Sequence, residues 1–116
     1  MTGNKTLNKK FLSLPGVKNA IETFMEKTGF DEEETIVIFD EFLNVFKNSL
    51  AEINKSIEEK NYEELYKKAH SLKGTFVNLY MPECADLSIE LEQNAKAENI
   101  ERCRDILNKI QKIITD

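Results

Sequence analysis

The chemistry of this 116-residue chain centres on its one histidine, His70, in the segment Ala69-His70-Ser71-Leu72-Lys73-Gly74. A neutral imidazole nitrogen is a competent nucleophile near pH 7. Lys73 would supply positive charge to a group attached to His70, and Gly74 would leave open surface beside the ring because it has no side chain. The spacing therefore predicts an accessible imidazole with a positive charge nearby.

These residues lie on one predicted helix that has a well-defined apolar stripe. Winding the helix at about 100° per residue places His70 roughly 130° from the centre of the stripe, so we expect its side chain to be exposed. An exposed glycine in mid-helix costs about 1 kcal/mol relative to alanine, and no core position requires one here. The residues of this face that we predict to contact a partner protein are Lys67, Gly74, Val77 and Asn78.

A single exposed histidine, lysine or glycine is common on helices and indicates little by itself. Their joint arrangement is more informative, because Gly74 is the one glycine after residue 29 and lies four residues from His70. Other reactive arrangements lack their parts: the sequence has no glycine-rich phosphate loop, no convincing Cys-His or Ser-His pair and no spaced set of metal ligands. We expect no cofactor or metal in this chain, and we interpret its many carboxylates as a solvated surface.

Five helices are predicted to position this face. A short helix lies between Pro15 and Gly29, and four longer ones begin near Asp31, Asn61, Pro82 and Asn99. Because their connections are short, consecutive helices are antiparallel neighbours. The predicted fold is all-α, an antiparallel up-down-up-down four-helix bundle over residues 31–116, with an N-terminal segment over residues 1–30 that contains the additional short helix. A second apolar row of the first long helix, formed by Ile38, Phe42 and Val45, also needs a cover. We expect the short helix to provide it, and a partner protein is the alternative.

Composition narrows the function classes further. The chain has 16 Lys and Arg against 21 Asp and Glu, a net charge of −5, which argues against nucleic acid as a partner. Cys84 and Cys103 are expected to be reduced core thiols. No apolar run approaches the roughly 18 residues of a membrane span, and the first ten residues lack the apolar region of a signal peptide. We therefore expect a cytoplasmic monomer that does not bind membranes.

The segment around His70 resembles the core motif of the histidine-containing phosphotransfer (HPt) domain family, His-x-Leu-Lys-Gly. Asn78-Leu79 and Leu91-Glu92 match the family as well, and the similarity spans Phe30 to Asp116. One position departs from the pattern. Many members have a second glycine six residues after the first, where this chain has Tyr80, and we expect this change to affect the turn or the edge of the docking surface rather than His70.

The resemblance implies a phosphorelay intermediate of two-component signal transduction. His70 would accept a phosphoryl group from an aspartyl phosphate of a response-regulator receiver domain, or from a hybrid sensor histidine kinase, and would donate it to a receiver. Lys73 would stabilise charge, Mg²⁺ would belong to the receiver, and the chain would have no kinase activity of its own. Two alternatives stay open: a non-phosphorylated helical adaptor that binds a receiver through the same face, and the HPt domain of a larger hybrid histidine kinase.

Overall fold

The computed structural model describes residues 9–115, and every regular element in this range is an α-helix. The all-α prediction is therefore confirmed. The first eight residues of the predicted N-terminal segment 1–30 lie outside the described residues. A helical segment over residues 9–13 comes first, followed by α2 (Pro15–Thr28), α3 (Glu32–Glu58), α4 (Tyr62–Asn78), α5 (Pro82–Lys96) and α6 (Ile100–Thr115).

Helices α3, α4 and α6 begin, and helix α2 ends, at the predicted capping residues. Asp31 Oδ1 accepts a hydrogen bond from the backbone N–H of Glu34 at 2.8 Å, and Glu34 Oε1 accepts one from the N–H of Asp31 at 3.1 Å. The side chains of Asn61 and Asn99 accept backbone hydrogen bonds in the first turns of α4 and α6. Gly29 ends α2 with a φ of 78°. These local signals satisfy N–H groups that a helix leaves without an internal partner, and so they fix the boundaries.

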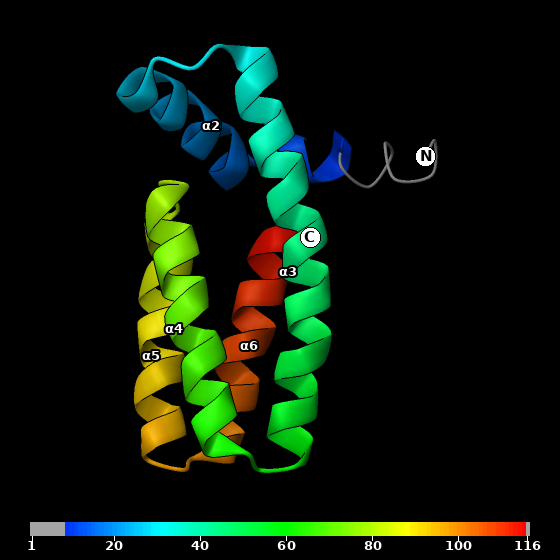
Figure 1. Ribbon diagram of the computed structural model, residues 1–116, viewed down its shortest axis with the longest axis vertical. Helices are drawn as coiled ribbons and strands as arrows, with labels where there is room; N and C mark the ends of the chain where they lie inside the picture. The colour runs from blue at the N-terminus through cyan, green and yellow to red at the C-terminus, as the bar shows by residue number, and fades with distance from the viewer. Residues whose placement is uncertain (1–8, 116) are drawn as a thin grey trace.

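Helices α3 to α6 pack lengthwise, and α2 crosses their upper end (Figure 1). In this view the α3–α4 and α5–α6 connections lie at the lower end, and the α4–α5 connection lies at the upper end. Consecutive helices contact one another, and α3 also contacts α6. The core consists of large apolar side chains from these helices, and burial of each contributes roughly 1.5–3 kcal/mol. Its largest fully buried members are Phe39, Phe46, Ile53, Leu65, Phe76, Leu91, Ile106, Leu107, Ile110 and Ile114.

The second apolar row of α3 is covered differently from the prediction. Phe42 is buried against Phe11 of the 9–13 helical segment, with ring centroids 6.2 Å apart. Helix α2 instead places Phe24 against Phe39, with centroids 5.8 Å apart. Val45 stays 61% exposed. The prediction that the short helix covers this whole row is wrong, because another helical turn precedes it and makes the contact with Phe42.

Three helix connections contain a non-glycine residue in the left-handed conformation, namely Lys60, Tyr80 and Glu98, with φ of 54°, 59° and 55°. At the end of α4, the N–H of Tyr80 donates to the carbonyl of Val77, and the N–H of Met81 donates to that of Phe76. This pair of bonds ends the helix in a Schellman motif, whose left-handed position favours glycine because other residues lose roughly 1 kcal/mol or more there. Tyr80 thus closes the same kind of turn that a glycine would, at some cost in stability.

Candidate functional site

His70 lies in the middle of α4, and its side chain is 60% exposed. The predicted exposure is confirmed. On either side of His70 along the chain, Ala69 and Leu72 are buried and anchor α4 to the core. The imidazole is therefore presented to solvent by a helix whose rotation is fixed by packing rather than by a loop, which gives it a defined position.

A carboxylate from the neighbouring helix contacts the imidazole. Oε1 of Glu92, on α5, lies 3.4 Å from Nδ1 of His70, and the Glu92 side chain is only 13% exposed. An Nδ1–H that faces this oxygen would leave the lone pair on Nε2. The arrangement thus favours the tautomer in which Nε2 is the free nucleophile.

The same carboxylate oxygen also faces Lys73. The Nζ atom of Lys73, whose side chain is 31% exposed, lies 3.6 Å from Oε1 of Glu92. The Lys73 contact has the distance of an ion pair, the His70 contact is an ion pair only when the imidazole is protonated, and both distances exceed the usual hydrogen-bond length. Glu92 Oε1 itself is buried and accepts no hydrogen bond. One buried oxygen therefore lies between an imidazole and an ammonium group, and a small movement would let either one donate to it.

An aromatic side chain contacts His70 one helical turn earlier. The rings of Tyr66 and His70 are stacked at 21°, with centroids 6.3 Å apart. The ammonium of Lys96, on α5, lies 4.9 Å from the centre of the Tyr66 ring. Such contacts are individually weak, about 0.5–1 kcal/mol each. Together they restrict the Tyr66 ring that lies beside the imidazole.

The residues predicted to contact a partner are all exposed on α4. Lys67 lies 3.4 Å from Glu63, an exposed pair that contributes little to stability. A Cβ added at Gly74 would meet no atom within 4 Å, so the space beside His70 is open. Val77 is 57% exposed, and Asn78 is exposed at the last position of α4. The structure therefore brings the predicted face together, with Lys73 half-buried at its α5 side.

Three residues around His70 were not predicted as site residues: Glu92, Tyr66 and Lys96. A sequence signal for Glu92 exists, because it continues the row of buried Ala85, Ser88 and Ala95 at intervals of three and four. A carboxylate in such a row needs a polar partner on the facing helix. No comparable signal marks Tyr66 or Lys96, since half-buried tyrosines and exposed lysines are ordinary on bundle helices.

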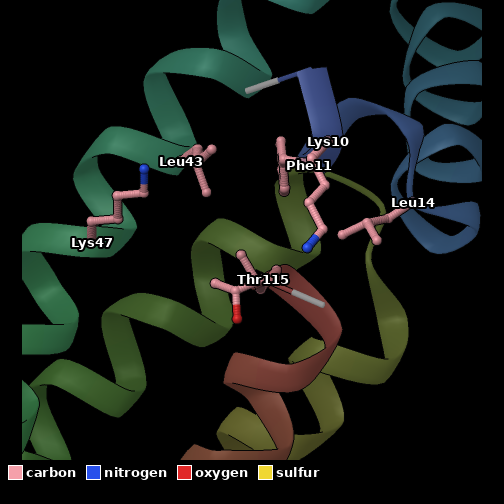
Figure 2. A pocket seen from close by; sticks show the side chains of 7 residues that line it. Lys10, Phe11, Leu14, Leu43, Lys47 and Thr115 are labelled. Atoms are coloured by element: carbon pink, nitrogen blue, oxygen red, sulfur yellow. The ribbon is translucent and has the colours of Figure 1, made fainter. Parts of the chain in front are cut away.

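A small hollow elsewhere in the molecule contains none of the residues around His70. It is lined by residues of the segment 10–14, α3 and α6, and has a volume of about 80 Å³ (Figure 2). Apolar Phe11 and Leu43 form part of it, and the side chains of Lys10 and Lys47 lie at its edge. Two surface lysines around a small apolar hollow do not make a reactive site, so the His70 face is the stronger candidate.

Comparison with known families gives a match that spans α4 to α6 and most of α3. The family model described as Hpt domain matches residues 37–116, a range that contains His70, Lys73, Gly74 and Glu92. No curated protein and no solved structure matches the chain. None of the helices within residues 9–115 is long and apolar enough to cross a membrane.

Proposed function

We propose, from the premise that this chain belongs to the Hpt domain family, that His70 is a phosphoryl acceptor and donor in a two-component phosphorelay. Hpt domains are phosphotransfer modules of such relays and interact with receiver domains and histidine kinases. The observation that carries the proposal is the exposed imidazole whose Nδ1 faces a buried carboxylate 3.4 Å away. This geometry favours the neutral tautomer in which Nε2 carries the free lone pair.

In the forward reaction, the Nε2 lone pair of His70 attacks the phosphorus of an aspartyl phosphate on the receiver. An N–P bond forms, the P–O bond to the aspartate breaks, and the aspartate leaves as a carboxylate. With Nδ1 still protonated, the phosphorylated ring is formally cationic, and the carboxylate of Glu92 offsets that charge. The same cationic ring is a good leaving group, so a second receiver aspartate can take the phosphoryl group in the reverse sense.

The other residues of the face assist by position and charge. Phosphoryl transfer depends on in-line placement and on stabilisation of the equatorial oxygens. Lys73 supplies a positive charge near these oxygens, and Gly74 leaves room for the receiver to approach. Lys67, Val77 and Asn78 contact the receiver around the reacting groups. Mg²⁺ is held by the receiver and offsets charge from its side of the interface.

The proposal extends to the helix topology, the oligomeric state and the location of the protein. We infer that α3 to α6 form the up-down-up-down bundle, which the alternating ends of their connections support (Figure 1). The protein acts as a monomer in the cytoplasm and has no kinase activity of its own. If the chain is part of a larger hybrid histidine kinase, the His70 chemistry is the same.

The test is transfer of labelled phosphate from a phosphorylated receiver domain to this chain. We expect label on the chain that is stable in base and labile in acid, as an N–P bond requires, and mass spectrometry should locate it at His70. His70→Gln should accept none while keeping its helical circular dichroism. Label that persists in this variant would overturn the assignment.

The alternative adaptor function predicts a different result. A non-phosphorylated adaptor would bind a receiver through this face equally well with His70→Ala and would never carry label. Measuring receiver binding and label transfer on the same His70→Ala protein therefore separates the two functions. The buried carboxylate beside Nδ1 favours the phosphotransfer function, because an adaptor has no need for a fixed imidazole tautomer.

A further inference from the structure

A groove at the upper end of the bundle adjoins the His70 face. It is lined by the end of α4, the α4–α5 connection, the first half of α5 and one residue of α2, and its volume is about 460 Å³. The α4–α5 connection is at the upper end in Figure 1. Val77, Tyr80 and Ile89 line it and are 57%, 36% and 39% exposed. Large apolar side chains gathered in one open groove are typical of an interaction site.

Tyr80 is the residue that distinguishes this groove from a simple helix end. Lys60 and Glu98 share its left-handed backbone in the connections at the opposite end of the bundle, but neither has an aromatic side chain. The ring of Tyr80 packs edge-on against Phe24 of α2, with centroids 6.1 Å apart at 77°, and forms part of the groove wall. Because the left-handed backbone is common to all three connections, it is the partly exposed aromatic ring in the groove wall that points to a role for this side chain.

The groove is close enough to His70 to lie under the same partner. Val77 follows His70 by two helical turns, roughly 10 Å along the helix axis. On α5, Ile89 precedes Glu92 by one turn. A standard interface covers about 800 Å² on each partner, which corresponds to a disc of roughly 16 Å radius. A receiver centred on His70 therefore also covers the part of the groove formed by Val77 and Ile89, and its edge reaches Tyr80, roughly 15 Å along the axis from His70.

Charge indicates what kind of surface the groove accepts. Asp86 is the one acidic or basic residue among those lining the groove, and its side chain is exposed. The other lining residues are apolar apart from Thr23 of α2 and the hydroxyl of Tyr80. A protein surface that fits this groove would therefore be apolar, with a lysine or arginine placed opposite Asp86. Without such a partner, the Asp86 carboxylate would be covered but unpaired, and this would weaken binding.

We propose that this groove selects the receiver partner of His70, by binding an apolar patch of the receiver that is flanked by a lysine or arginine facing Asp86. The proposal rests on the proposed phosphotransfer function and adds a specificity site to it. Tyr80 and Ile89 are specificity residues in this scheme and do not touch the reacting atoms.

The test compares receiver-dependent transfer with receiver-free phosphorylation. Purified receiver domains, phosphorylated with phosphoramidate, are first screened for transfer to the wild-type chain, and the fastest becomes the probe. Ile89→Asp, Tyr80→Gly and Asp86→Lys are then compared with wild type. Lys60→Gly is the matched control, because it relieves the same left-handed backbone as Tyr80→Gly but lies away from the groove. Direct labelling of His70 by phosphoramidate reports whether the histidine itself is intact.

We expect the three groove variants to raise the receiver concentration needed for half-maximal transfer by about tenfold. Their rates at saturating receiver and their direct labelling by phosphoramidate should stay within about threefold of wild type, and Lys60→Gly should match wild type throughout.

Unchanged receiver dependence in all three groove variants would overturn the groove proposal alone. Sedimentation that shows a wild-type dimer lost in these variants would assign the groove to a second copy of the chain and would also overturn it. Failure of wild type to accept phosphate from any source would overturn the phosphotransfer function and the groove proposal together.

Discussion

Nδ1 of His70 lies 3.4 Å from Oε1 of Glu92, although the two residues come from different helices and are 22 positions apart in the chain, 92 minus 70. This contact joins the exposed imidazole on α4 to a largely buried carboxylate on α5. It depends on the close packing of these two helices, which have the most extensive contact in the bundle. The tautomer of the reactive ring is therefore linked to the tertiary structure.

Removing the carboxylate should slow phosphoryl transfer without unfolding the bundle. Glu92→Ala deletes the carboxylate whose Oε1 lies 3.4 Å from Nδ1 and offsets the charge of the phosphorylated ring, so we expect transfer to fall about tenfold. Glu92→Gln should fall less, because its amide oxygen can still accept from Nδ1–H. Nitrogen NMR of the imidazole should show a mixed tautomer population in Glu92→Ala and mainly Nδ1–H in wild type. Equal tautomer populations in both proteins would contradict this role.

Substitution of Lys73 should separate its charge from its packing. Lys73→Met keeps much of the aliphatic stem but removes the ammonium 3.6 Å from Glu92, and we expect transfer to slow about tenfold. Lys73→Arg keeps the charge and should retain most of the rate. Single-turnover kinetics with a phosphorylated receiver measure both variants. Full activity of Lys73→Met would show that this charge does not stabilise the transferring group.

Substitutions of Gly74 should increase the stability of the fold, but bulky ones should slow phosphoryl transfer. Nothing lies within 4 Å of a Cβ added there, so Gly74→Ala should raise the free energy of unfolding by up to about 1 kcal/mol through helix propensity. Gly74→Gln should fold equally well but slow transfer from a receiver, because its side chain would occupy the open surface beside His70. Urea unfolding and transfer assays on both variants test this. A normal transfer rate in Gly74→Gln would show that access does not require glycine.

Asp40 on α3 should make the fold less stable as pH rises. Burial raises the pKa of its carboxyl above the ordinary 3.8, and its Oδ1 is buried without a hydrogen-bond partner. Because the folded state disfavours the charged form, stability is lost as pH rises from the ordinary pKa through the raised one. Asp40→Asn removes this charge and should gain up to about 1 kcal/mol at pH 7, seen as a melting temperature higher by roughly 4 °C. The gain should vanish near pH 3, and a gain that is the same at both pH values would contradict the titration.

The local features of this protein could be predicted because they depend on residues within a turn or two of each other. The caps at Asp31, Asn61 and Asn99 follow from side chains three residues before the groups that they bind. The exposure of His70 follows from the helical period of α4, since Ala69 and Leu72 must face the core. The motif around His70 is likewise continuous in sequence.

The contact of Phe11 with Phe42 could not be predicted in the same way. It depends on where the short segment before Pro15 lies in space, and a single helical turn has too little periodicity to predict. The groove at Tyr80 is a similar case. Its turn conformation is local, but its contact with Phe24 requires α2 to cross the end of the bundle.

The sequence by itself determined the helices, their ends and the outward direction of His70, because backbone hydrogen bonds and the apolar period act over short distances. Only the tertiary structure decided that Glu92 faces Nδ1, that Lys73 shares the same carboxylate oxygen, and that Tyr80, Val77 and Ile89 meet in one groove. These contacts depend on the axial shift and rotation of α4 against α5, which are set by the packing of the whole core rather than by any one segment.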